Sequence, residues 1–251
     1  MNSNQIERYS RQISLFGSAG QENLFSAKIL VIGAGGLGSP ATFYLAAAGI
    51  GKIGIVDGDK VDLSNLQRQI LHSTDNLNQN KADSARKTLN SLNPDVKIIT
   101  YNEKATSSNI KDIIRDQNYN FILDCTDNFE SKFLINDACV ELKKPFTHAG
   151  ILHYGGQLMT YLPEKSACYR CVFDEPPPNQ IFSAREGIFN VAAGIIGTLQ
   201  ASEALKFFLG VGNLLTNCLL TYNALNSEFR KVKIPRNKNC KICGERNSIH
   251  A

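Results

Sequence analysis

The chain has 251 residues, of which 43% are hydrophobic and 20% charged, with a formal net charge of +4. This length and composition predict a globular protein with a sizeable core, and the short, scattered basic runs predict no nucleic-acid partner. The polar start lacks an apolar leader, and the most apolar late segment, 191–215, is interrupted by charged residues, so no membrane span is expected. Seven cysteines in such a sequence favour reduced thiols in the cytoplasm.

The first predicted element is an amphipathic helix near the start of the chain. Apolar side chains recur there at helical spacing, at Ile6, Tyr9, Ile13 and Phe16. Gly17 follows directly, and a glycine commonly ends a helix. We therefore expect the helix to stop at Gly17.

Short apolar runs and helical stretches alternate over the next part of the chain. Strands are predicted at 28–32, 52–56, 97–101 and 121–124, and helices at 39–49, 80–92, 108–117 and 128–143. Such alternation is typical of an α/β protein with a Rossmann-like, doubly wound, mostly parallel sheet.

The pattern changes after the glycine pair at 155–156. Residues 157–161 and 219–222 indicate antiparallel C-terminal strands, and about 194–209 indicates a helix. The proline-rich stretch 173–180 cannot continue a helix or a central strand. We therefore expect a mobile crossing loop at roughly 172–187.

A glycine-rich turn follows the first predicted strand and opens a helix. Gly33, Gly35 and Gly38 have the spacing of a dinucleotide fingerprint, in which backbone approaches phosphate and a helix N-terminus attracts anions. Asp57 ends the second strand, where an acid typically bonds a ribose hydroxyl. The alternative is a turn that only packs a helix on a strand. The context favours a nucleotide site.

Cationic and acidic residues in the following segments bear on which nucleotide binds. Arg68, in the segment 64–69, and Lys81 would neutralise a triphosphate, whereas NAD needs no such cluster. Asp127 and Asn128 follow the fourth strand, at the sheet edge where ligands bind, and Asp127 suits Mg²⁺. Taken singly, the cations are equally explained as solvated charges, and Asp127 as a helix cap.

Two identical C-x-x-C pairs lie late in the chain, at Cys168 with Cys171 and at Cys240 with Cys243. Four thiolates suit one structural, tetrahedral Zn²⁺. Disulfides are the alternative, but a reducing compartment disfavours them, and a redox motif normally occurs once. The other three cysteines lie in apolar contexts and are expected in the core.

These motifs together resemble those of the ThiF/MoeB/HesA adenylyltransferases, bacterial relatives of the ubiquitin-activating enzymes. The resemblance runs from about residue 8 to residue 244. It rests on the motifs at 8–12, 33–38, 64–69, 124–128 and 155–157 and on the two cysteine pairs.

The resemblance implies ATP-dependent adenylation of a small ubiquitin-like sulfur carrier protein, of ThiS type or MoaD type, for thiamine or molybdopterin biosynthesis. The carboxylate of the carrier's C-terminal Gly-Gly would attack the α-phosphorus and release pyrophosphate. A carboxylate is already ionised at pH 7, so no general base is needed, and the four histidines are expected to be structural or on the surface.

The resemblance also assigns roles to residues. Gly36 and Asp57 would contact the adenosine end, Asn65, Arg68 and Lys81 the triphosphate, and Asp127 the Mg²⁺. Arg11 resembles the family's arginine that reaches the partner protomer's ATP, which implies a homodimer. Catalysis would rest on Arg11, Arg68, Lys81 and Asp127. The implied ATP-binding set is Gly33, Gly35, Gly36, Gly38, Asp57, Ser64, Asn65, Leu66, Gln67, Arg68, Lys81, Asp127 and Asn128.

We expect a single adenylation domain over 1–251. Its nucleotide-binding part would be about 1–165, and its zinc, crossover-loop and carrier-binding part about 166–251. Several relatives carry in the loop a cysteine that links covalently to the carrier, but here that position is Ser183. A hydroxyl is a poor substitute for a thiolate, so the enzyme is expected to stop at the acyl-adenylate. A separate sulfur donor would then be required.

Two other functions stay open at this point. One is an NAD-dependent oxidoreductase with a structural zinc, against which the cluster of Arg68, Lys81 and Asp127 argues. The other is a non-catalytic module that binds a ubiquitin-like protein without turning over ATP. Carrier binding without pyrophosphate release would identify the second.

Overall fold

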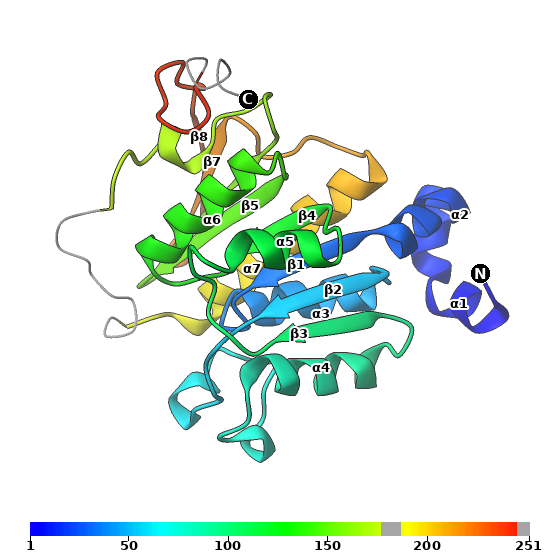
Figure 1. The fold of residues 1–251 in the computed structure, drawn as a ribbon. Coiled ribbons are helices and arrows are strands. Elements are labelled where there is room, and N and C mark those ends of the chain that lie inside the picture. The colour runs from blue at the N-terminus through cyan, green and yellow to red at the C-terminus, as the bar shows by residue number, and fades with distance from the viewer. Residues whose placement is uncertain (177–186, 245–251) are drawn as a thin grey trace.

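A computed structural model describes residues 1–176 and 187–244. One eight-stranded sheet runs through it in the order β3-β2-β1-β4-β5-β6-β7-β8 (Figure 1). The strands are β1 Lys28–Ile32, β2 Lys52–Val56, β3 Lys97–Tyr101, β4 Phe121–Asp124, β5 Phe146–Leu152, β6 Gly155–Tyr161, β7 Cys218–Asn223 and β8 Glu228–Lys233. The first five in sequence pair in parallel, and β5 to β8 pair antiparallel. The predicted α/β fold, with its antiparallel C-terminal strands, is confirmed.

Helices cover both faces of the sheet (Figure 1). They are α1 Ser3–Arg8, α2 Ser10–Ser26, α3 Gly38–Ala47, α4 Lys81–Leu92, α5 Ile110–Asp116, α6 Phe129–Glu141 and α7 Asn190–Leu209. On one face α2, α3, α4 and α7 share an apolar core with the strands, through side chains such as Leu24, Leu45 and Ile196. On the other face α5 and α6 pack through Ile114 and Ile135, together with three of the motif cysteines.

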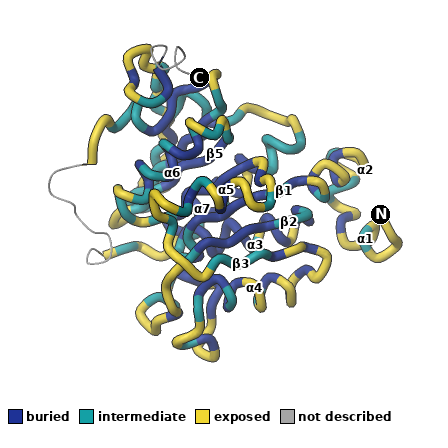
Figure 2. The backbone as a smooth tube through the Cα atoms, viewed as in Figure 1, coloured by how far each residue is buried: buried dark blue, intermediate teal, exposed yellow. Residues whose placement is uncertain are grey.

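The central strands are buried because both of their faces are covered. β1 and β2 run through the dark-blue interior of the tube in Figure 2, and every residue of β4 is buried. Buried strands of this kind read as continuous apolar runs, which is why the predicted bounds of β1, β2 and β4 agree with the structure.

The N-terminal region differs from the single predicted helix. Two helices, α1 and α2, meet at Tyr9, whose ring is buried against Phe25. Gly17 is non-helical, with φ 76° and ψ 170°, but the chain resumes its helix and reaches Ser26. The helical period was read correctly up to Gly17. The part of the helix after Gly17 was not predicted, because the next buried apolar side chain after this glycine is Leu24.

The crossing loop lies largely outside the described residues, and Ser183 with it. Its flanks are described. Arg170 donates to the Asp174 carbonyl, and Lys241 pairs with Glu175, which ties one flank to both cysteine pairs. On the other flank, Asn190 donates to the Gln67 carbonyl at 3.0 Å. One flank is therefore attached to the cysteine pairs, and the other to the turn that carries Arg68.

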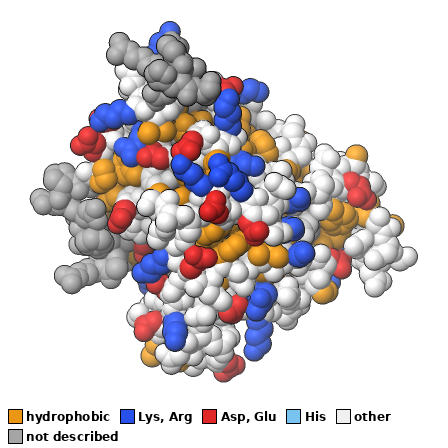
Figure 3. Space-filling view, viewed as in Figure 1, with side chains coloured by type: hydrophobic (Ala, Val, Ile, Leu, Met, Phe, Trp, Pro, Cys, Tyr) orange, Lys and Arg blue, Asp and Glu red, His pale blue; other side chains and the backbone are white. Residues whose placement is uncertain are grey.

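The molecular surface mixes charges of both signs. In Figure 3, Lys and Arg side chains lie beside Asp and Glu side chains on the face shown. Among the described residues, no helix is both long and apolar enough to cross a membrane. The cytoplasmic location expected from the cysteines stays a prediction.

Candidate active site

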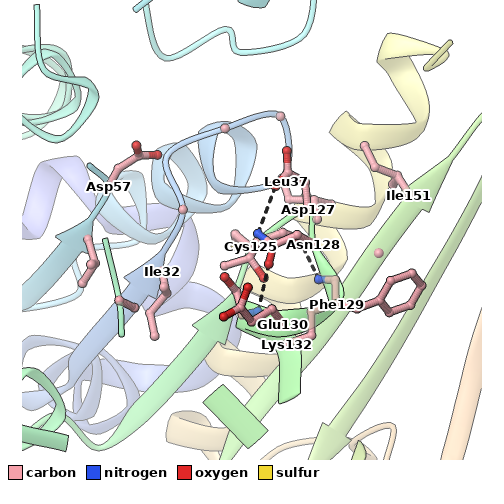
Figure 4. Close-up of a pocket in the computed structure, with 18 of the residues that line it drawn as sticks. Ile32, Leu37, Asp57, Cys125, Asp127, Asn128, Phe129, Glu130, Lys132 and Ile151 are labelled. Atoms are coloured by element: carbon pink, nitrogen blue, oxygen red, sulfur yellow. Dashed lines mark hydrogen bonds between the residues drawn. The ribbon is translucent and has the colours of Figure 1, made fainter. Parts of the chain in front are cut away.

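A pocket of about 1160 Å³ lies outside the carboxyl ends of β1, β2 and β4. The chain runs from β1 to β2 and β3 on one side, and then returns to place β4 on the other. Open α/β sheets bind ligands at this switch point. Figure 4 shows Asp57 at the end of β2 and Asp127 with Asn128 near the end of β4, farther along the same edge.

The glycine loop between β1 and α3 forms one wall of the pocket. Gly33 has φ +101°, and a Cβ there would lie 2.7 Å from the Cys125 carbonyl oxygen. A Cβ at Gly38 would overlap the Gly33 carbonyl, so only glycine fits either position. Gly33, Gly35 and Gly36 line the pocket, whereas Gly38 lies behind them. The loop therefore brings bare backbone to the ligand.

Two side chains, the buried His72 and the half-buried Asp57, hold Ala34, the second residue of that loop. The Asp57 carboxylate accepts from its amide at 2.8 Å, and the His72 Nε2 lies 2.9 Å from its carbonyl. Because a carbonyl only accepts, His72 donates from Nε2 and accepts from Ser84 at Nδ1. Burial lowers the pKa of His72. Burial also raises the pKa of Asp57, and the positive charge of Lys81 offsets part of that rise. Asp57 thus fixes the loop as well as facing the pocket.

The predicted cations reach the same pocket. Lys81 is buried at the start of α4, with its Nζ 3.4 Å from the Asp59 carboxylate. Arg68 lines the wall opposite Gly36 and donates to the Ser64 carbonyl at 3.2 Å. The short 3-10 turn Leu63–Asn65 precedes it and fixes its backbone. Two positively charged side chains therefore line the pocket beside the glycine loop, whose spacing is typical of phosphate-binding loops.

Asp127 and Asn128 also line the pocket, and their side chains have different roles. The Asn128 side chain accepts from the Ser131 amide at 2.9 Å and caps α6. The explanation of Asp127 as the helix cap is therefore wrong, because its neighbour does that work. Asp127 is left at the pocket edge, where a carboxylate suits Mg²⁺.

Other predicted residues lie near the pocket but do not line it. Ser64, Asn65, Leu66 and Gln67 form the turn behind Arg68, and Ser64 and Gln67 are exposed. Arg11 is exposed on α2, away from its own chain's pocket. Cys125 and Cys139 are buried in the core as expected, and Cys218 is half-buried.

Sequence reasoning missed a buried ionic group beneath the pocket. Lys132 of α6 donates at 2.6 Å to the carbonyls of both Thr126 and Ala149, and it lines the pocket (Figure 4). Asp124, fully buried, accepts from His148 at 2.8 Å. Burial raises the pKa of Asp124, but Lys132 and His148 outweigh it and hold it at about 2. Burial and Lys132 lower the pKa of His148 to about 4, so His148 is neutral at pH 7.

The pocket has two parts of different charge. The charged part is lined by Asp57, Asp59, Arg68, Lys81, Glu103, Lys104, Asp127, Glu130 and Lys132. The uncharged part is lined by Gly150, Ile151, Leu152, Gly155, Gly156, Gln157, Tyr169, Ile188, Thr221 and Tyr222. Among the described residues, no ionisable carboxylate or cation lines the second part. The charged part has five carboxylates beside its four cations, so it suits phosphate at Arg68 and Lys81 and a cation at the carboxylates, and the second part suits an uncharged chain.

The four motif cysteines meet at the end of the sheet beyond α6. Their sulfur atoms all lie within 4.8 Å of one another, with Cys168 and Cys240 3.7 Å apart and Cys171 and Cys243 3.4 Å apart. Four thiolates bonded to zinc at about 2.3 Å would lie about 3.8 Å apart at tetrahedral angles. The predicted cluster is present, and its donors fit a closed metal site.

The sequence matches the ThiF family model over residues 9–242, and the chain belongs to this family. It is 42% identical over 250 residues to the sulfur carrier protein adenylyltransferase of Thermus thermophilus, covering 96% of this chain and 92% of that protein. It is also 42% identical to the adenylyltransferase and sulfurtransferase MOCS3 of Culex quinquefasciatus, covering 99% of this chain but only 58% of that protein. The chain thus spans little more than half the length of MOCS3.

The fold is shared with a solved structure of E. coli MccB with ATP. The TM-score is 0.84 at 23% identity, and the match covers 94% of this chain and 74% of that chain. The similarity confirms the architecture of the whole sheet and its helices.

Proposed function

We propose that this protein transfers AMP from ATP to the C-terminal carboxylate of a small ubiquitin-like sulfur carrier protein. The observation that carries the proposal is the two-part pocket at the switch point of a ThiF-family chain. Its similarity to proteins named adenylyltransferases supports an enzyme that transfers AMP. An oxidoreductase that binds NAD is not favoured, because Arg68, Lys81 and Asp127 line the site together.

ATP would lie in the charged part. The backbone of Gly33, Gly35 and Gly36 would approach the nucleotide, and Asp57 would face the ribose. Arg68 and Lys81 would neutralise the phosphates, with the turn of Ser64, Asn65, Leu66 and Gln67 supporting Arg68. Mg²⁺ bound beside Asp127 would supply further neutralisation of phosphate charge.

The carrier's Gly-Gly tail would enter through the uncharged part. A tail without side chains suits walls that include Gly150, Gly155 and Gly156. A carboxylate oxygen of the tail attacks the α-phosphorus and forms a new P–O bond. The bond to pyrophosphate breaks, and pyrophosphate leaves with the electron pair. The residues act by positioning and charge neutralisation, since the nucleophile is already ionised.

Zinc in the four-cysteine cluster would be structural. Four protein ligands leave no open position, so the metal would supply folding free energy rather than chemistry.

A homodimer is part of the proposal. Arg11 is exposed and outside its own chain's pocket, which supports a role at the pocket of a second copy. A separate sulfur donor is proposed from the family resemblance and from Ser183, and thiamine and molybdopterin biosynthesis are both candidate pathways.

The test is carrier-dependent ATP–pyrophosphate exchange with a ThiS-type and a MoaD-type carrier, each with and without its terminal Gly-Gly. Exchange with one intact carrier, and none with its truncated form, would support adenylation and name the pathway. ATP binding without exchange on either carrier would overturn the activity and favour a module that only binds.

A further inference from the structure

Tyr169 lies between the four-cysteine cluster and the nucleotide pocket. It follows Cys168 in the first cysteine pair, is wholly buried, and lines the pocket. Its ring packs 4.2 Å from the His148 ring and 5.0 Å from that of Phe133, measured between centroids. Tyr169 therefore lines the nucleotide pocket with its side chain and lies between the two ligands of the first cysteine pair in the sequence.

A continuous series of contacts leads from this ring to the loop that carries Asp127. His148 donates from Nδ1 to one oxygen of Asp124 at 2.8 Å. The other oxygen of Asp124 accepts from the amide and the hydroxyl of Thr126, at 3.1 and 2.6 Å. Thr126 precedes Asp127 directly. Each of these contacts is short, and Tyr169, His148 and Asp124 are all buried.

The cysteine pair is also fixed to the helix that begins after Asp127. The Tyr169 amide donates to the buried Asn136 side chain at 2.8 Å. Arg170 binds both oxygens of Asp137, at 2.7 and 2.8 Å, and lies over the Phe133 ring. All three partners belong to α6. The first cysteine pair is thus attached to the base of the Asp127 loop by two routes.

We propose that Tyr169 is a positioning residue that sets the loop of Thr126 and Asp127 according to the geometry of the four-cysteine cluster. The inference rests on the proposed function only in taking Asp127 as the Mg²⁺ partner. Close-packed interiors transmit small displacements, and a shift of about 1 Å in a positioning group is enough to affect a site. Without the ring, His148 loses a packing partner, and its hydrogen bond to Asp124 is no longer held in place from that side.

The ring, and not the hydroxyl, carries this role. Within the described residues, the Tyr169 hydroxyl is buried and has no hydrogen-bond partner. Phenylalanine keeps every ring contact and removes only that hydroxyl, so Tyr169→Phe should behave as the wild type. Leucine keeps an apolar side chain but loses the packing against His148.

The experiment is calorimetric titration of ATP into the full-length protein, once with Mg²⁺ and once in chelator-free buffer without Mg²⁺, so that zinc is not removed from the cluster. We expect Tyr169→Leu to weaken ATP binding in Mg²⁺ by about tenfold, and without Mg²⁺ by no more than about twofold. Zinc content, measured in the same samples, should be unchanged. Tyr161→Leu is the matched control, because Tyr161 is buried in the same core cluster as the cysteines but has no ring contact with His148 among the described residues. It should leave ATP affinity unaltered.

His148→Phe provides an independent arm should Tyr169→Leu lose its zinc or fail to fold. It keeps a ring against Tyr169 but breaks the link to Asp124, so the same Mg²⁺-specific loss is expected. Equal affinities for wild type, Tyr169→Leu and His148→Phe in Mg²⁺ would overturn the proposal, as would a Tyr169→Phe variant as weak as Tyr169→Leu. A wild type that binds no ATP under either condition would instead count against the proposed function.

Discussion

The charged and uncharged parts of the pocket are built from different halves of one sheet. The charged part lies at the ends of parallel strands, where the loop after β1 supplies glycines and the loops after β2 and β4 supply Asp57, Arg68 and Asp127. The uncharged part lies against β5, β6 and β7, which contribute backbone, glycines and Gln157. Strand ends gather loops that can carry many charges. Strand faces instead offer a flat, regular surface that suits an extended chain.

The largest effect is expected in the charged part. Arg68→Ala removes a cation at the proposed phosphate site and should slow carrier-dependent ATP–pyrophosphate exchange by about 10²- to 10³-fold. Arg86→Ala is the matched control, because Arg86 makes an exposed ion pair with Asp83 on α4 and does not line the pocket. Equal exchange rates for the two variants would break the assignment of the charged part to the triphosphate.

A smaller and different effect is expected in the uncharged part. A Cβ at Gly155 would meet the Leu152 and Tyr222 carbonyl oxygens at 3.4 and 3.8 Å, which are ordinary contacts, so Gly155→Ala should fold. The added methyl narrows the proposed path of the tail, and the KM for the carrier should rise about tenfold. The KM for ATP should not change. Gly194→Ala, on α7 with open space around it, is the control. If only the KM for ATP rises, the nucleotide and not the carrier tail binds in the uncharged part, and the assignment of the two parts is reversed.

The buried group at the boundary of the two parts predicts a dependence of stability on pH. The pKa of His148 is lowered to about 4 from 6.5, so the folded state binds fewer protons than the unfolded state between these values. The free energy of unfolding should therefore fall as pH drops from about 6.5 to 4. The lowered pKa of Asp124 extends the fall toward pH 2. Thermal unfolding of His148→Phe should show a shallower fall above pH 4, and identical slopes would refute this.

The smallest effect is expected at Ser183. If the enzyme stops at the acyl-adenylate, Ser183→Ala should leave the yield of carrier thiocarboxylate unchanged in a complete sulfur-transfer assay. A collapse of that yield would show that the hydroxyl forms a covalent link, and it would extend the chemistry beyond the two-part pocket.

The sequence predicted the parallel half of the fold more closely than the antiparallel half. β1 and β4 are buried on both faces, so their apolar runs have clear bounds. β8 was missed because five of its six residues are exposed, and Glu228, Arg230, Lys231 and Lys233 read as a solvated segment. A strand with so little burial is specified by its pairing with β7, which no local pattern reveals.

The site shows the same limit. Gly33, Arg68 and Asp127 were predictable because the chemistry of phosphate binding selects their types and order. Lys132 was not, because a lysine in a helix is usually solvated, and only the tertiary fold brings the Thr126 and Ala149 carbonyls to its ammonium group. His72 and His148, expected to be structural or on the surface, are structural, and they support the two loops that face the pocket. His250 lies outside the described residues.

The restraint of Ala34 has a thermodynamic consequence. Asp57 and His72 hold the amide and the carbonyl of this residue, so the glycine loop has its shape before any nucleotide arrives. Ligand binding then costs little additional conformational entropy in the loop, because the ordering has already occurred during folding. A loop rich in glycine, which is the most flexible kind of backbone when the chain is unfolded, thereby acts as a rigid template in the folded protein.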